Sequence, residues 1–179
     1  ARTLGIAAEP WDTWSRQTRQ RAVRALGRFA TRTGLPQGVP YALIGDSSQA
    51  ASWALFLTDY LGMRPVMLGL HEVGTRSLAF IRHFLKEREL STDVLVHPDQ
   101  YLLRDTLRRQ SPWLVLGSGF EEQILLSWPK EQRPLFIETA YPGWRNVRLT
   151  HRPLMGWGGV LTLVEELINT LQVHSTASL

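Results

Sequence analysis

Three short glycine-containing segments carry the residue types that could contact a ligand. They are Gly45-Asp46-Ser47-Ser48, Gly69-Leu70-His71 and Gly117-Ser118-Gly119-Phe120-Glu121. Each follows a short apolar run, and glycine lets the backbone turn sharply and lets a ligand approach closely. Two of the three also precede a helical pattern, and the free N–H groups of a helix N-terminus favour anions. We therefore expect these segments to be ligand-facing loops.

The spacing within these segments excludes several kinds of chemistry. The first segment is neither Gly-x-Gly-x-x-Gly nor followed by Gly-Lys-Ser/Thr, so dinucleotide and nucleoside triphosphate binding are not indicated. Gly117-Ser118-Gly119 lacks the frame of a hydrolase nucleophile elbow. His71 is the best candidate for proton transfer or ligation. A purely structural role stays open, because Asp46, Ser47 and Ser118 are common helix-capping types and His71 could simply bond the backbone.

The elements that must position these loops alternate along the chain. Short apolar runs predict strands at 41–44, 65–68, 93–96, 113–116 and 135–137, and 3.6-residue periodicity predicts helices at 47–61, 75–89, 100–110, 120–127 and 158–171. This pattern is typical of an α/β, Rossmann-like three-layer domain with a five-stranded, mostly parallel sheet. With right-handed crossovers we expect the strand order 3-2-1-4-5. The three loops then meet at the carboxyl edge of the sheet.

A separate basic helix is predicted before the first strand. Asp12 or Thr13 could cap it, Gly34 could end it, and its expected apolar stripe is Val23, Leu26, Phe29 and Ala30. We therefore expect a basic N-terminal helix and linker over 1–38 and the Rossmann-like domain over 39–179. Residues 1–40 carry seven arginines against two acids, a balance of +5, whereas residues 41–179 carry thirteen basic and fourteen acidic side chains, a balance of −1. A solvated face or one that docks on an acidic partner is favoured over a nucleic-acid site, because no aromatic residues alternate with the arginines.

The amino-acid composition narrows the class of protein further. The 179 residues are 44% apolar and 20% charged, which is typical of a globular domain. The absence of cysteine excludes disulfides and thiolate ligands in this chain. With no long apolar run and no leader pattern, we expect a cytoplasmic protein without a membrane partner. Because the chain begins with Ala1 and not methionine, we expect a processed chain or a piece of a longer one.

Several motifs recur in a characteristic order along the chain. They are Gly45-Asp46, Leu61-Gly62-Met63-Arg64-Pro65-Val66, Pro112-Trp113-Leu114-Val115-Leu116-Gly117-Ser118-Gly119-Phe120-Glu121, Tyr141-Pro142, Arg152-Pro153-Leu154-Met155-Gly156-Trp157-Gly158-Gly159 and Ile168-Asn169-Thr170-Leu171. This ordered set, over about residues 39 to 172, resembles the C-terminal domain of the nitrogenase component 1 family. That family includes nitrogenase subunits, their cofactor-assembly scaffolds and dark-operative protochlorophyllide and chlorophyllide reductases.

The resemblance implies that this chain is one truncated domain of an oxidoreductase subunit. Such subunits have three similar domains and a sister subunit, and an ATP-dependent iron–sulfur reductase supplies their electrons. The cysteines that hold the bridging cluster lie in the first domain, so an iron–sulfur or related metallocluster is expected in the parent assembly and none on this chain alone. The isolated chain is expected to be inactive, and its role would be to line a metallocluster or tetrapyrrole cavity and to support subunit assembly.

The resemblance also implies which residues line that cavity. They are expected to line it without being catalytic and are Gly45, Asp46, Ser47, Gly69, His71, Gly117, Ser118, Gly119 and Glu121. No histidine stands at 143–147, where an α-type nitrogenase subunit would have a cofactor ligand, and His151 is too far along. The ten residues between Pro142 and Pro153 look more like a β-type subunit or the B-type subunit of protochlorophyllide reductase. The alternative is a free-standing flavodoxin-like module that binds a small anionic ligand.

Overall fold

The computed structural model describes residues 9–33, 36–143, 152–154 and 156–176 and divides the chain into two compact units. One unit spans residues 35–147, and the other combines residues 1–34 with residues 148–179. The first of these contains β1 (Pro40–Gly45), α2 (Ser47–Asp59), β2 (Arg64–Leu70), α3 (Thr75–Glu87), β3 (Asp93–Val96), α4 (Gln100–Gln110), β4 (Leu114–Gly117), α5 (Gly119–Leu126), the 3₁₀ helix η2 (Lys130–Gln132) and β5 (Leu135–Glu138). The other contains α1 (Glu9–Thr33) and α6 (Gly156–Thr176).

The unit of residues 35–147 is built on a parallel five-stranded sheet. The strand order is β3-β2-β1-β4-β5, which confirms the order predicted from the crossovers. Every pairing is parallel, and β1 is the central strand because it pairs with both β2 and β4. Strand β2 runs to Leu70, so Gly69 and Leu70 belong to the strand and not to the loop in which the sequence placed them.

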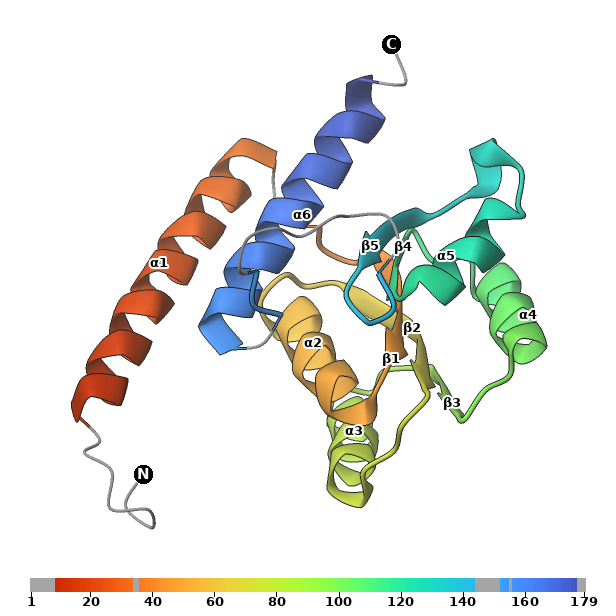
Figure 1. Cartoon of the computed structure of the whole chain (residues 1–179), viewed down its shortest axis with the longest axis horizontal. Helices are drawn as coiled ribbons and strands as arrows, with labels where there is room; N and C mark the ends of the chain where they lie inside the picture. The colour runs from red at the N-terminus through yellow and green to blue at the C-terminus, as the bar shows by residue number, and fades with distance from the viewer. Residues whose placement is uncertain (1–8, 34–35, 144–151, 155, 177–179) are drawn as a thin grey trace. The chain divides into compact units, whose positions relative to one another are not determined.

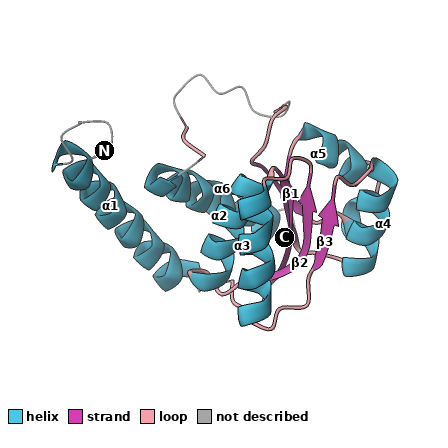
Figure 2. Ribbon diagram, turned by 90° about the horizontal axis from the view of Figure 1, so that it is seen from below, coloured by secondary structure: helices cyan, strands magenta, loops and turns pink. Residues whose placement is uncertain are grey.

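Helices cover both faces of this sheet, as Figure 2 shows: α2 and α3 lie on one face, and α4 and α5 on the other. Alternate residues of a strand point to opposite faces, so Ala42 and Ile44 pack toward α4 and α5. There they join a buried cluster with residues of β2, β4, α4, α5 and the turn after α5, namely Met67, Val115, Leu103, Leu107, Leu125 and Trp128. These layers confirm the predicted α/β three-layer class, and their parallel strands bring all the strand-to-helix loops to one edge.

The unit that joins the two terminal helices was not indicated by the sequence pattern. Helices α1 and α6 pack side by side, and the guanidinium of Arg19 lies 5.6 Å from the ring centroid of Trp157. Helix α1 begins at Glu9, so Asp12 is inside the helix and is not its cap. Val23, expected in the apolar stripe, is 53% exposed, whereas its neighbour Ala22 is fully buried.

Neighbouring residues of a helix differ by about 100° around its axis. An apolar stripe that is placed one residue too far along the sequence, at Val23 and not at Ala22, therefore points away from the buried side of the helix. The Phe29 and Ala30 side chains, the predicted helix end at Gly34, and His151 lie outside the described residues. No described helix has the length and apolar character that crossing a membrane would require.

Tyr41 anchors α2 to the central strand. Its side chain is fully buried. Its hydroxyl lies 3.3 Å from the carbonyl oxygen of Ala54 and 3.1 Å from Oγ1 of Thr58. Burial raises the pKa of the Tyr41 hydroxyl well above its usual range, with the hydrogen bond from Thr58 opposing that rise. The neutral phenol is therefore the form that the folded protein requires.

Replacing Tyr41 with phenylalanine should lower the free energy of unfolding by about 1 kcal/mol at neutral pH, because a buried hydrogen bond is lost. The natural protein should lose stability as pH rises above about 10, because the unfolded tyrosine then ionises while the folded one, with its raised pKa, keeps its proton. Urea titrations between pH 7 and pH 11 would measure both effects. The pH-dependent loss should be smaller in Y41F, and an identical loss in both proteins would contradict this role for Tyr41.

Candidate functional site

The candidate site lies at the carboxyl edge of the sheet, where backbone hydrogen bonds join the loops that follow the strands. The N–H of His71 donates to the carbonyl oxygen of Gly45 at 2.9 Å, which ties the β2 loop to the β1 loop. The backbone N–H of Ser47 donates to the backbone carbonyl oxygen of Glu72 at 2.8 Å, and the hydroxyl of Ser47 accepts from the N–H of Gly74 at 2.8 Å. These bonds fix the start of α2 against the loop that leads into α3.

A buried carboxylate, Glu121, links the second and third predicted segments. Its side chain is 2% exposed, and it accepts from the N–H of Ser118 at 2.7 Å and from the hydroxyl of Ser118 at 2.5 Å. Its other oxygen lies 3.1 Å from Nε2 of His71, which can donate to it. The imidazole is 43% exposed, so the pair runs from solvent into the interior. The structure therefore brings together His71, Ser118 and Glu121, which are 50 residues or fewer apart in the sequence.

This cluster does not have the geometry of a nucleophilic triad. In a triad the histidine lies between the serine and the acid and takes the proton of the serine. Here the carboxylate of Glu121 lies between Ser118 and His71, and the hydroxyl of Ser118 donates to that carboxylate. The oxygen of Ser118 also accepts from the N–H of Phe120 at 3.2 Å, and Ser118 and Glu121 together form a capping box at the start of α5. The arrangement holds a helix end and does not activate a nucleophile.

Asp46 performs the same task at the start of α2. One carboxylate oxygen accepts from the N–H groups of Ser48 and Gln49, at 3.0 and 2.9 Å, and from the hydroxyl of Ser48 at 2.6 Å. Burial opposes ionisation of Asp46, but these hydrogen bonds outweigh it and hold its pKa below the usual range. Asp46 is therefore an ionised N-cap near neutral pH, and it places a negative charge beside the first loop.

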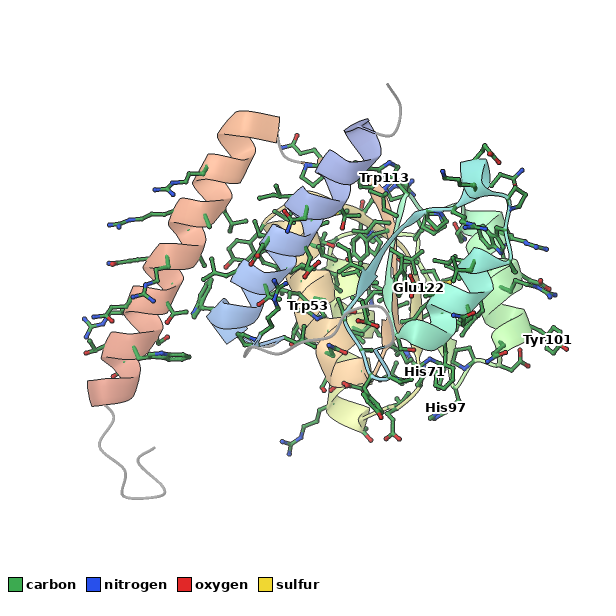
Figure 3. All side chains as sticks on the ribbon, turned by 45° about the horizontal axis from the view of Figure 1, so that its top comes forward. Trp53, His71, His97, Tyr101, Trp113 and Glu122 are labelled. Atoms are coloured by element: carbon green, nitrogen blue, oxygen red, sulfur yellow. The ribbon has the colours of Figure 1, made fainter. Side chains whose placement is uncertain are left out.

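His97 is a member of this site that the sequence did not single out. Its Nδ1 lies 2.7 Å from the carbonyl oxygen of His71, and its N–H donates to the carbonyl oxygen of Leu70 at 2.8 Å. Figure 3 shows the two histidines close together at this edge. The backbone of His97 is left-handed, with φ of 47°, directly after β3. The His-Pro pair at the end of an apolar run was the available signal.

Two buried acids were also missed. Glu122, in the first turn of α5, and Glu138, the last residue of β5, are 9% and 6% exposed. A Cβ atom on Gly143 would lie 2.9 Å from the carboxylate of Glu138, so a larger residue there would displace that carboxylate. The available sequence signal for Glu122 was its place beside Glu121 at the start of α5. Acidic residues are common there because they interact favourably with the helix dipole, so the pattern alone did not indicate burial.

The predicted glycines have different surroundings. Gly69 lies within β2, and a Cβ atom there would approach Leu103 at 3.0 Å and Ile44 at 3.2 Å, so its small size serves packing under α4. A Cβ on Gly117 would lie 3.1 Å from the carboxylate of Glu121, so glycine there makes room for the buried acid. The N–H of Gly119 donates to the carbonyl oxygen of Pro142 at 2.7 Å, which joins the α5 start to the loop after β5.

Together, the parallel sheet and its interlocked strand-end loops define a Rossmann-like domain of the kind that binds ligands at the carboxyl edge. The sequence model of the nitrogenase component 1 type oxidoreductases matches residues 2–172, and this chain belongs to that family. The solved structure titled "Nitrogenase Cp1 at pH 6.5" has a similar fold, with a TM-score of 0.75 at 19% sequence identity. The similarity covers 89% of this chain but 33% of that one, so the chain spans about a third of its length.

Iron–sulfur clusters are a property of this family, and the residues described here do not fit one. The sequence has no cysteine. Within the described ranges, no three side chains among histidine, aspartate and glutamate come together as a metal site. The imidazole of His71 and the carboxylate of Glu121 are bonded to each other. The described residues therefore offer no ligand set for a cluster.

The pair of His71 and Glu121 can be tested by a double-mutant cycle. We expect Glu121→Gln to lower the free energy of unfolding by about 1–3 kcal/mol, because an amide cannot accept all three bonds of the buried carboxylate. His71→Ala should cost less, since that ring is 43% exposed. The coupling energy from urea unfolding of the two single variants and the double variant should reach at least about 0.5 kcal/mol. Additive effects would contradict a direct interaction.

Gly69 offers a second test, with Gly27 as its matched control. Gly69→Val should destabilise the protein by about 1–3 kcal/mol, because the added methyl groups overpack the space beside Leu103 and Ile44. Gly27 is an exposed position of α1, and a Cβ atom there would meet nothing within 4 Å. Gly27→Ala should therefore leave stability unchanged or raise it by up to about 1 kcal/mol. Urea unfolding compares the two, and a neutral Gly69→Val would show that the site is not close-packed.

Proposed function

We propose that this chain is one domain of a nitrogenase-like oxidoreductase subunit and that its strand-end edge lines a cavity of the parent assembly. The cavity would hold a metallocluster or a tetrapyrrole, and the chain would support subunit assembly. The observation that carries this proposal is the interlocked edge, where Glu121 joins the β2 loop to the start of α5. In parallel sheets this edge is where ligands bind, and here it is preorganised by hydrogen bonds before any ligand arrives.

The polar groups of this edge support a lining role better than a catalytic one. Asp46 is occupied by the first N–H groups of α2, and Glu121 is occupied by Ser118 and His71. A catalytic acid or base must reach a proton of the substrate, directly or through one water. The groups named here are committed to holding loops in place, so their contribution would be shape and local charge.

The same bonds count against the alternative, a free-standing module for a small anion. An anion at a helix N-terminus needs free N–H groups and a positive local field. The starts of α2 and α5 instead have their own carboxylates, from Asp46 and Glu121, as hydrogen-bond acceptors. A bound anion at either place would meet a negative charge and would find N–H groups already bonded.

The rest of the assembly follows from the proposed role. The chain would work with the remaining domains of its parent protein, a sister subunit and an ATP-dependent iron–sulfur reductase, in the cytoplasm. The cluster ligands would come from those other parts, because this chain has no cysteine. We favour a β-type nitrogenase subunit or the B-type protochlorophyllide reductase subunit, because ten residues separate Pro142 from Pro153.

Anaerobic isolation of the tagged chain from its source cells would test this function. We expect iron in the isolated material, together with polypeptides that contain cysteine and belong to the same family. The chain purified alone should show no turnover with a strong reductant and ATP. Isolation of an iron-free chain without family partners would contradict the proposal, as would reductase activity of the chain alone.

A further inference from the structure

Two imidazole rings lie at the strand-end edge, and the contacts of each ring determine which of its nitrogens carries a proton. Nε2 of His71 lies 3.1 Å from the carboxylate of Glu121, and Nδ1 of His97 lies 2.7 Å from the carbonyl oxygen of His71. A carboxylate and a carbonyl oxygen can only accept hydrogen bonds, so each of these two nitrogens is the N–H donor. In a neutral imidazole the other nitrogen then has a lone pair. His71 therefore presents Nδ1 as an electron-pair donor, and His97 presents Nε2.

These two lone-pair nitrogens are not used within the part of the chain that the structure describes. Among the described residues, no hydrogen bond or ion pair involves Nδ1 of His71 or Nε2 of His97. Both rings also reach the solvent, because the His71 side chain is 43% exposed and His97 is an exposed residue. Two solvent-accessible lone pairs therefore remain for a group that accepts electron pairs, which is what a metal cation does.

The contacts of the two rings are those that metal-binding histidines usually make. Such a histidine commonly donates its second ring N–H to a carboxylate or to a backbone carbonyl, which fixes the ring and makes the ligating nitrogen more basic. His71 has a carboxylate as its partner, and His97 has a backbone carbonyl. Glu121 is itself held by the N–H and the hydroxyl of Ser118, at 2.7 and 2.5 Å. The rings are therefore oriented as ligands before any ion is bound.

The backbone brings the two histidines to the same part of the edge. The N–H of His97 donates to the carbonyl oxygen of Leu70, and the ring of His97 donates to the next carbonyl along, that of His71. The N–H of His71 in turn donates to Gly45, so the loops after β1, β2 and β3 are hydrogen-bonded in series. Figure 3 shows the two labelled histidines as neighbours. Two strand ends thus contribute one imidazole each to one place on the surface.

The charges around the two rings favour a cation. Glu72 follows His71 directly, Asp99 lies two residues after His97, and both acids are exposed. Asp46 lies on the neighbouring loop, and its hydrogen bonds keep its pKa below the usual range, so it is ionised near neutral pH. Negative charges within a few ångströms of a site attract a divalent cation and repel an anion. The local field therefore supports metal binding at the two histidines.

We propose that His71 and His97 bind one divalent transition-metal ion, such as Zn²⁺, Ni²⁺ or Cu²⁺, through Nδ1 and Nε2 respectively. Imidazole nitrogen suits these ions, whereas Mg²⁺ and Ca²⁺ prefer oxygen ligands. No third histidine, aspartate or glutamate joins the pair within the described residues, so water or a ligand from outside the chain would fill the other positions of the ion. This mononuclear site differs from an iron–sulfur cluster, which needs thiolates. It requires no parent assembly and so does not depend on the proposed function.

Calorimetric titration of the untagged, metal-free chain with ZnCl₂ would test the site, with MgCl₂ as a comparison. We expect a single saturable site for Zn²⁺ and none for Mg²⁺. His71→Ala and His97→Ala should each weaken Zn²⁺ binding at least about tenfold, because each removes one of the two ligands. Circular dichroism would confirm that both variants remain folded.

The matched control for these variants is His83→Ala. Nε2 of His83 lies 3.2 Å from the carboxylate of Glu87, so this histidine has the same kind of partner, but it lies on exposed α3 and its side chain is 68% exposed. This variant should change Zn²⁺ affinity less than about twofold. An equal loss in His83→Ala would show adventitious binding to surface histidines, and an unchanged affinity in His97→Ala would show that the two rings do not act together. Either result would overturn the proposed site.

Nuclear magnetic resonance of the natural chain provides a second test, which no folding defect of a variant can obscure. Before metal is added, ¹⁵N spectra of the imidazoles should show the proton of His71 on Nε2 and that of His97 on Nδ1. Zn²⁺ should then shift the resonances of Nδ1 of His71 and Nε2 of His97 most strongly. Shifts confined to one of the two rings, or the absence of any saturable Zn²⁺ response, would refute a two-histidine site.

Discussion

The candidate site depends on one buried carboxylate. Glu121 is 2% exposed and would be costly to bury unless its oxygens were bonded. Ser118 satisfies one oxygen and His71 the other, so the cost of burial is offset only if α5 starts where it does and the β2 loop stays in place. Gly117 favours the same arrangement, since a Cβ atom there would lie 3.1 Å from the carboxylate of Glu121. A single acid thus couples two loops that the sequence separates by 50 residues.

This coupling explains which parts of the structure the sequence could predict. Strand β3 was placed at its observed bounds, and the order of all five strands was correct, because apolar runs, periodicity and crossover handedness are local or general properties. The loops were expected to meet because parallel strands end at one edge. The contact between His71 and Glu121 was not predictable, because it depends on side-chain directions that no sequence spacing encodes.

The errors have physical causes as well. Gly69 was read as a loop residue because glycine commonly ends a strand, but here it lies inside β2 to make room for Leu103 and Ile44. Val23 was placed in the apolar stripe of α1, yet the small residue Ala22 is the buried one. In both cases the residue type was interpreted by its usual role, whereas the closeness of a neighbouring element decided the outcome.

The two units use charge in different ways. Near the strand-end edge, the exposed Asp46 and the buried Glu121 are both hydrogen-bonded within the chain, so their charges hold loops and helix ends. On α1, in contrast, Arg16, Arg21, Arg24 and Arg28 are all exposed. Buried charges bonded within the chain fix the shape of a site, whereas exposed charges mainly set the electrostatic field at the surface.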